Sequence, residues 1–364
     1  MKNLLVSFGT RPEVIKLAPI VTELKTRDDI SVVVCNTEQQ KELSRQAMSY
    51  FGLKSDICLD VMTYNQTLTS LQCRMMERLE SIFNQNHYDG VLVQGDTMTV
   101  LATSLVAFYN KVPIFHIEAG LRTDNLYSPF PEEGIRRLVS RLAMLNFAPT
   151  KRAKQQLLNE GISSEKILVT GNTSIDAIKQ YLQSSCGHQA DSGIRKNPKV
   201  LITVHRRENH GSNLQQIILA IKKLSEIFHF CQFIWPVHPN PNVRLPVERA
   251  FNSKSNVHLV DPMDYPKLVE TMSSVALILT DSGGIQEEAT LFNIPILVLR
   301  DTTERQEGVE SGHAFLVGTD VEKIIETTSY FLNGGRLKLA EQFPYGDGTA
   351  SIKIANEIAK FLFG

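Results

Sequence analysis

The chain of 364 residues has few cysteines, and their arrangement is typical neither of a disulfide framework nor of a zinc site. The five cysteines are scattered and include no CxxC pair, whereas such sites need cysteines at close, regular spacings. Long apolar runs are also missing, so we expect no membrane-spanning helix. Residues 1–8 carry one charge and a short apolar run that stops at Gly9, which is typical of a first strand and not of a signal peptide. These absences predict a cytoplasmic protein without a metal site.

An excess of charge of one sign is missing as well. The formal net charge is -1 and no dense run of lysine and arginine occurs, so we expect neither nucleic acid nor a membrane as a main partner. A hydrophobic content of 42% with 21% charged residues is typical of a globular protein. A chain of this length exceeds one ordinary core, which favours two domains. Any anion-binding site must therefore be local.

Short apolar runs alternate with amphipathic helical stretches, a pattern that predicts parallel sheets covered by helices. We expect an α/β fold with two Rossmann-like domains at 1–183 and 199–350, a polar linker at 184–198, and a helix at 351–364 that crosses back to the first domain. Between the first two strands of the second domain, apolar residues recur at helical spacing behind Ser212 or Asn213 as a cap. The predicted strands are Leu4–Phe8, Ser31–Cys35, Gly90–Val93, Val112–Ile117, Leu145–Ala148, Val200–Val204, Phe233–Pro236, Val257–Leu259, Ala276–Thr280 and Ile296–Leu299.

The most informative segment follows the strand that ends at Thr280. There the chain runs through Ser282, Gly283 and Gly284 into a helix. Unpaired amides at a helix start and the helix dipole favour a phosphate, and glycines let a ligand approach the backbone. Glu288, about one turn further on, suits a ribose diol. The alternative is a tight strand-to-helix turn with a solvated acidic face.

In open parallel sheets, ligands bind beyond the carboxyl ends of the strands. Arg11 follows the first strand and is a candidate phosphate ligand, or else a surface arginine beside a helix start. Asp96, Glu118 and Glu132 follow later strands or open the next helix. Crowded carboxylates suit acid and base work. Alternatively, each of them caps a helix or pairs with an arginine.

In the second half, His205 follows a strand and is a candidate general acid or phosphate ligand. A lone histidine more often satisfies a backbone group, but this one heads a strand in register with the glycine-rich turn. Together with His116, Glu118 and His238 it gives a possible zinc set, which the absence of close ligand spacing disfavours.

Eight ordered motifs that cover nearly the whole chain closely resemble those of the non-hydrolysing UDP-N-acetylglucosamine 2-epimerases of bacteria and archaea. The Pro-Glu pair after Arg11 favours the non-hydrolysing branch. The motifs begin with Gly9-Thr10-Arg11-Pro12-Glu13, Gly95-Asp96-Thr97, His116-Ile117-Glu118-Ala119-Gly120-Leu121-Arg122 and Gly171-Asn172-Thr173, and continue with His205-Arg206-Arg207-Glu208-Asn209, Asp281-Ser282-Gly283-Gly284-Ile285-Gln286-Glu287-Glu288, Arg300-Asp301-Thr302-Thr303-Glu304-Arg305 and Pro344-Tyr345-Gly346-Asp347-Gly348.

This resemblance implies a glycosyltransferase-B type fold, in which two domains face each other across a cleft, and a homodimer. It implies reversible inversion at C2 of the sugar by elimination and re-addition of UDP, without metal or nicotinamide. It further implies production of UDP-N-acetylmannosamine for surface polysaccharide. By the same resemblance, Asp96, Glu118, Glu132 and His205 fall on essential positions, and the UDP-binding positions are Arg11, Ser282, Gly283, Gly284 and Glu288.

Some members of the family bind a second UDP-N-acetylglucosamine as an activator, through positions that match Gln39, Arg74, Arg206 and His238. Ile135 stands where relatives usually carry an amide, and we expect it in the loop that contacts the sugar. Three other functions remain open. They are epimerisation of a modified UDP-amino sugar, glycosyl transfer on the same fold, and a catalytically weak paralogue that binds UDP-sugar.

Overall fold

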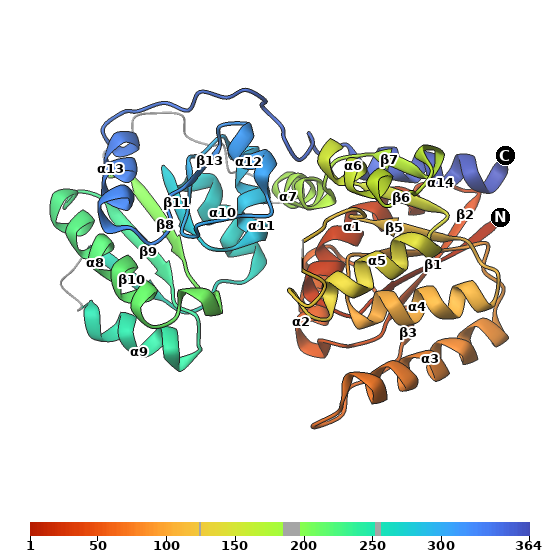
Figure 1. Ribbon diagram of the computed structural model, residues 1–364. Coiled ribbons are helices and arrows are strands. Elements are labelled where there is room, and N and C mark those ends of the chain that lie inside the picture. Colours follow the sequence, from red (N-terminus) through yellow and green to blue (C-terminus); the bar gives the residue numbers. More distant parts are fainter. Residues whose placement is uncertain (124, 185–196, 252–255) are drawn as a thin grey trace. The chain divides into compact units, whose positions relative to one another are not determined.

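The computed structural model describes residues 1–123, 125–184, 197–251 and 256–364. The chain divides into two compact units, each an α/β body with its own parallel sheet (Figure 1). The first unit holds Met1–Ser184 and Tyr345–Gly364, and the second holds Ser185–Pro344. The predicted fold class of two Rossmann-like bodies is confirmed.

In the described part of the first unit, seven parallel strands form one sheet in the order β3-β2-β1-β4-β5-β6-β7. The strand order reverses between β1 and β4, so the residues after these two strands flank the crevice where such sheets bind ligands. The strands are β1 Lys2–Phe8, β2 Ile30–Asn36, β3 Ile57–Cys58, β4 Gly90–Gln94, β5 Ile114–Ile117, β6 Leu145–Ala148 and β7 Ile167–Val169.

Helices cover both faces of this sheet. They are α1 Arg11–Lys25, α2 Lys41–Tyr50, α3 Leu68–Gln85, α4 Met98–Tyr109, α5 Glu132–Leu142, α6 Lys151–Asn159, α7 Thr173–Ser184 and α14 Ala350–Phe363, with the 3-10 turn η1 Ser164–Lys166. Helix α4 packs between α3 and α5, whereas α1 packs against α2, α7 and α14 (Figure 1). The start of α1 follows from its sequence, because Thr10 and Glu13 form a capping box and Pro12 fits the first turn.

Among the residues described in the second unit, six parallel strands form a sheet in the order β10-β9-β8-β11-β12-β13, which reverses between β8 and β11. The strands are β8 Lys199–Thr203, β9 Gln232–Pro236, β10 Val257–Val260, β11 Leu277–Thr280, β12 Ile296–Val298 and β13 Ala314–Leu316. The helices are α8 Ser212–Ile227, α9 Pro241–Ala250, α10 Tyr265–Ser274, α11 Gly283–Glu288, α12 Gln306–Glu310 and α13 Val321–Leu332, with the 3-10 turns η2 Arg207–Asn209 and η3 Ala289–Phe292.

The structure differs from the sequence expectations in several details. Strands β3, β7 and β13, of two or three residues each, were not among the predicted strands. The cap of α8 is Gly211, so neither expected cap residue holds that place. Tyr345 lies in the first unit, because its carbonyl accepts a hydrogen bond from Asn172 N at 2.7 Å. The expected linker falls mostly on residues 185–196, outside the described residues.

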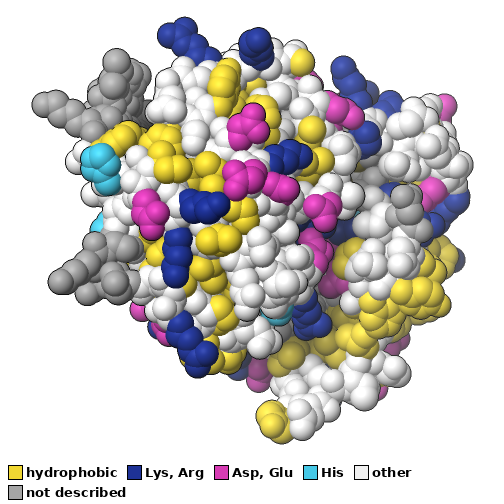
Figure 2. Space-filling view, turned by 60° about the vertical axis from the view of Figure 1, so that its left-hand side comes forward, with side chains coloured by type: hydrophobic (Ala, Val, Ile, Leu, Met, Phe, Trp, Pro, Cys, Tyr) yellow, Lys and Arg dark blue, Asp and Glu magenta, His cyan; other side chains and the backbone are white. Residues whose placement is uncertain are grey.

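Two further properties of the structure bear on function. No helix in the described parts of the chain is long and apolar enough to cross a membrane. On the face shown in Figure 2, lysine and arginine side chains lie among acidic ones and form no broad basic patch. This distribution agrees with the net charge of -1.

Candidate active site

Glu118 follows β5 in the first unit and is held by two other elements. The Nζ atom of Lys16 on α1 lies 2.5 Å from Glu118 Oε2, and Gln94 at the end of β4 donates a hydrogen bond to the same oxygen. The Glu118 side chain is only 9% exposed, and its backbone has a φ of 62°, in the left-handed region. The sharp turn therefore fixes a carboxylate beside a cation at the carboxyl end of the sheet.

Asp96 follows the neighbouring strand β4. Its Oδ2 atom accepts from Arg136 Nε at 2.7 Å and lies 2.6 Å from Arg136 Nη2. The backbone of Gly95 donates to the Ile117 carbonyl at 3.1 Å, which brings the turns that carry Asp96 and Glu118 to one edge of the sheet. Pairing with an arginine is the alternative role that the sequence predicts for these carboxylates, and Asp96 does form such a pair.

His116 contacts the turn that carries Asp96. It is 1% exposed, and its Nε2 atom lies 2.8 Å from the Gly95 carbonyl. Burial lowers the pKa of His116 to about 4. The ring is therefore neutral near pH 7 and stabilises the turn before Asp96.

Glu132 and Glu133 open α5 and have different environments. Glu133 is 0% exposed and accepts from Thr123 N at 3.1 Å, Arg137 Nε at 2.8 Å and Arg136 Nη1 at 3.4 Å. In contrast, the buried Oε2 atom of Glu132 has no hydrogen-bond partner among the described residues. Glu133 thus ties the loop to the helix, whereas Glu132 keeps an oxygen available for a ligand.

Ile135 does not lie in a loop. It is 3% exposed and belongs to the apolar core under α5, which also contains Val139 and Ala143. The expectation that Ile135 lies in a loop is wrong, because the helix that begins at Glu132 places this position in the core.

Arg11 opens α1 and is half-buried. It forms no ion pair with the described part of the chain. Below it, the buried carboxylate of Glu13 accepts from Gly9 N at 2.9 Å, Thr10 N at 2.7 Å and Thr97 Oγ1 at 2.7 Å. Burial raises the pKa of Glu13 in spite of these hydrogen bonds. Glu13 therefore shapes the turn that presents Arg11.

The expected activator residues of the first unit make internal contacts. Gln39 Oε1 accepts from Thr99 Oγ1 at 3.0 Å. Arg74 Nη1 donates to the Val61 carbonyl at 2.8 Å and to Gln66 Oε1 at 2.6 Å. Both side chains thus hold neighbouring parts of the first unit together.

In the second unit, His205 forms a pair with a buried aspartate. Its Nδ1 atom lies 3.1 Å from Asp281 Oδ1, and the ring is 41% exposed while Asp281 is 0% exposed. Asp281 Oδ2 also accepts from His205 N at 3.0 Å, Arg206 N at 2.9 Å and Asn209 Nδ2 at 2.9 Å. One carboxylate therefore holds the ring and the loop that carries it.

Two opposing effects act on the pKa of Asp281. Burial raises it, but the hydrogen bond and charge of His205 and the amides of Arg206 and Asn209 outweigh burial and keep the pKa below its ordinary value. Asp281 is therefore ionised near pH 7. An ionised partner at Nδ1 leaves Nε2 of His205 as the nitrogen that can exchange a proton with a ligand.

The glycine-rich turn after β11 is open at one position. A Cβ atom at Gly284 would meet nothing within 4 Å, whereas one at Gly283 would lie 2.9 Å from the Arg305 guanidinium carbon. The amide of Ser282 already donates to Thr280 Oγ1 at 2.9 Å. The Ser282 amide thus has an internal acceptor in the described structure, and its contact with a phosphate stays a prediction.

Glu288 at the end of α11 is half-buried and lies near Tyr265. Burial and the charge of Glu288 hold the pKa of Tyr265 well above its ordinary value. The same face of the unit carries Arg305, whose Nε atom lies 2.9 Å from Glu287 Oε1. A carboxylate beside a phenol is thus placed one turn beyond the glycines.

Arg206 and His238 surround His205 in the second unit. The rings of His205 and His238 stack with centroids 6.1 Å apart and planes at 26°. Burial is the main cause that lowers the pKa of His238, and the charges of His205 and His210 lower it further. Arg206 Nη2 lies 3.4 Å from Glu304 Oε1. Both expected activator residues of this unit thus lie beside the His205 loop.

Sequence reasoning missed the partners of the candidate residues. Lys16, Gln94 and Asp281 were not assigned a role, although Gln94 ends β4 and Asp281 opens a motif, whereas Lys16 lies within α1. Strand register offers a signal for Asp281. The last residues of β8 and β11, Thr203 and Thr280, are paired across the sheet. His205 and Asp281 follow them by two residues and one residue, so the two side chains start from neighbouring points. In the described residues, no group of three or more His, Cys, Asp or Glu side chains is arranged to hold a metal ion.

Comparison with known proteins agrees with this geometry. The family model of UDP-N-acetylglucosamine 2-epimerase matches residues 22–359. The UDP-N-acetylglucosamine 2-epimerase of Neisseria meningitidis serogroup A is 45% identical over 98% of this chain and 99% of its own length. The enzyme of that name from Escherichia coli K12 is 42% identical over 97% of each chain.

Solved structures give the same result. The UDP-GlcNAc 2-epimerase from Neisseria meningitidis bound to UDP-GlcNAc superposes with a TM-score of 0.87 at 43% identity, over 98% of this chain and 100% of that chain. The glycosyltransferase of kitacinnamycin shares the fold alone, with a TM-score of 0.62 at 12% identity. The resemblance of the motifs is confirmed over the whole chain, and the chain belongs to the UDP-N-acetylglucosamine 2-epimerase family.

Proposed function

We propose that this protein interconverts UDP-N-acetylglucosamine and UDP-N-acetylmannosamine without hydrolysis, as a step toward surface polysaccharide. The observation that carries the proposal is the full-length match to a relative whose structure holds UDP-GlcNAc. The site adds independent support, because each unit presents polar residues at the point where its strand order reverses.

The proposed reaction needs a base at C2 and stabilisation of the leaving diphosphate. Removal of the C2 proton is coupled to cleavage of the C1–O bond, so that UDP leaves and a C1=C2 double bond forms in 2-acetamidoglucal. UDP then adds back at C1 while a proton reaches C2 from the opposite face. A weakly acidic C–H bond requires both a positioned base and a stabilised leaving group.

We assign the proton steps to Asp96, Glu118 and Glu132. Asp96 and Glu118 lie at one sheet edge, each positioned by a cation, where ligands bind in sheets of this kind. Glu132 contributes the buried oxygen without a partner in the described structure. Such an oxygen suits contact with the substrate, because buried acceptors otherwise lose hydrogen-bond energy.

We assign UDP binding to the second unit, with Ser282, Gly283, Gly284 and Glu288. The open space at Gly284 supports close approach of a phosphate to the backbone. Glu288 suits the ribose hydroxyls, and Arg11 supplies a cation without an ion pair of its own in the described chain.

We assign to His205 a proton or a hydrogen bond for the leaving diphosphate. The ionised Asp281 fixes the Nδ1 proton and stabilises the charged ring that forms when Nε2 takes up a proton. We further propose a homodimer in the cytoplasm, with no cofactor. We also propose that a second UDP-N-acetylglucosamine acts as an activator through Gln39, Arg74, Arg206 and His238.

Proton NMR in heavy water tests the reaction. With UDP-N-acetylglucosamine, we expect the signals of the C2 epimer to appear while deuterium replaces the C2 proton in both sugars. Release of free sugar would indicate hydrolysis instead. A spectrum without exchange or a new sugar would contradict the proposal, and the same assay with other UDP-amino sugars would then identify the substrate.

A further inference from the structure

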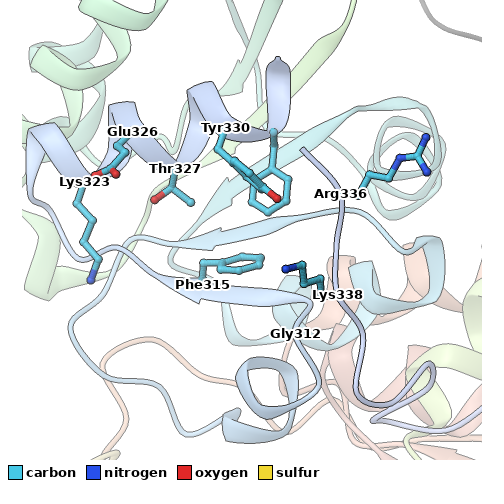
Figure 3. A pocket seen from close by; sticks show the side chains of 9 residues that line it. Gly312, Phe315, Lys323, Glu326, Thr327, Tyr330, Arg336 and Lys338 are labelled. Atoms are coloured by element: carbon cyan, nitrogen blue, oxygen red, sulfur yellow. The ribbon is translucent and has the colours of Figure 1, made fainter. Parts of the chain in front are cut away.

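A cavity lies in the second unit, beside the edge strand of its sheet. It has a volume of about 470 Å³, which is within the range of about 300 to 1,000 Å³ that is typical of small-molecule sites. Its residues come from β13, from α13 and from the segment that leads to the first unit (Figure 3). None of them belongs to the candidate active site.

The cavity is built by close approach of that segment to the sheet. Gly312 has a φ of 84°, and a Cβ atom there would lie 2.4 Å from the Lys338 carbonyl. The amide of Ala340 donates to the Ser311 carbonyl at 3.0 Å, and that of Gly335 donates to the Tyr330 carbonyl at 2.9 Å. These contacts fix the segment beside β13, so the cavity is a formed part of the fold.

One wall of the cavity is aromatic. Phe315 and Phe331 pack with ring centroids 5.1 Å apart, and Tyr330 and Phe331 pack at 5.0 Å. Although it belongs to this cluster, Tyr330 is 54% exposed. Exposed aromatic faces of this kind suit stacking against a planar ring.

The rest of the lining is cationic. Lys323, Arg336 and Lys338 surround the cavity with a single carboxylate, Glu326. In the described residues none of the three cations forms an ion pair. The cavity is therefore locally positive, whereas the whole chain has a net charge of -1. The amino group of Lys338 points toward the ring of Phe315, whereas Arg336 and Lys323 point away from the rings (Figure 3). Lys338 is therefore placed to meet an anion whose ring lies on the aromatic wall.

We propose that this cavity binds a small anion that carries a planar ring, the class that includes aryl phosphates and nucleoside phosphates. The rings take the planar part, and Lys338, with Arg336 and Lys323 at the rim, takes the charge. The site is separate from the one that we assign to the UDP-sugar.

Ligand-detected NMR on the full chain with phenyl phosphate tests the site. We expect saturable binding of this probe. Lys338→Glu should weaken binding by roughly tenfold or more, because a favourable charge contact becomes repulsive. Lys338→Arg should retain binding. Lys222→Glu, an exposed charge reversal on α8 of the same unit, should leave it unchanged.

The controls separate the parts of the proposal. Equal binding of phenol would contradict recognition of the anion, and equal binding of inorganic phosphate would contradict recognition of the ring. Binding that UDP-N-acetylglucosamine displaces and that Lys338→Glu leaves unchanged would place the probe in the active site and overturn the proposal. Tyr330→Ala should weaken phenyl phosphate more than inorganic phosphate. Tighter binding of uridine monophosphate than of phenyl phosphate would identify a nucleoside phosphate as the ligand, and the reverse order would identify an aryl phosphate.

Discussion

The two units hold their candidate site residues in different ways. In the first unit, two of the candidate carboxylates are held by side chains from other elements, Glu118 by Lys16 and Asp96 by Arg136. In the second unit, the single buried Asp281 gathers main-chain amides, an asparagine amide and a histidine ring. Single ion pairs therefore position the carboxylates of the first unit, whereas one buried carboxylate fixes a whole loop in the second unit.

Asp281→Asn tests the dependence on a single carboxylate and has the largest expected effect. The amide cannot stabilise a charged His205 ring, so we expect kcat to fall by about 1,000-fold or more, as in other histidine–aspartate pairs. Turnover is measured with UDP-N-acetylglucosamine, and circular dichroism checks the fold. Asp320→Asn, an exposed cap of α13, should keep normal turnover. Near-normal turnover of folded Asp281→Asn would remove the pair from the mechanism.

A matched pair of substitutions tests the first unit. We expect Glu132→Gln to lower kcat by roughly 100-fold or more with little change in stability, because its Oε2 atom has no partner in the described structure. Glu133→Gln should instead lower the free energy of unfolding by about 1 to 3 kcal/mol, since it weakens three hydrogen bonds to a buried charge. Urea denaturation and turnover of both variants distinguish the two roles. The opposite pattern would exchange the assignments.

Ile135→Asn tests whether the core under α5 supports this edge. Burial of an amide without a designed partner should lower the free energy of unfolding by about 1 to 3 kcal/mol, and turnover should not rise. Ile135→Val is the matched control, with an expected cost of about 0.5 to 1.5 kcal/mol. Thermal denaturation measures both. An Asn variant of normal stability with faster turnover would show that this position contacts the sugar.

Glu288→Ala has the smallest expected effect, because it removes one contact from a ligand held by several groups. We expect the affinity for UDP to weaken by about 1 to 3 kcal/mol, measured by calorimetry. Glu226→Ala on α8 serves as an exposed control. Unchanged UDP affinity in Glu288→Ala would contradict the assignment of the ribose to this residue.

Much of the fold was predictable from local patterns. The ten predicted strands all occur, with end points shifted by no more than two residues, because fully buried parallel strands are continuous apolar runs between turn signals. The three strands that were not predicted have only two or three residues each. The positions of the candidate residues were predictable for a related reason, since polar residues after parallel strands collect at one sheet edge.

The sequence by itself determined the two α/β units, the turns that present Arg11, Asp96, Glu118 and Gly284, and the family. Those features depend on residues close together along the chain. Only the tertiary structure decided which charges meet, because Lys16 and Glu118 are separated by 102 positions and His205 and Asp281 by 76. It also decided that Ile135 is buried and that β13, α13 and the segment after α13 enclose an aromatic, cationic cavity. Such outcomes depend on packing between elements, which local periodicity does not encode.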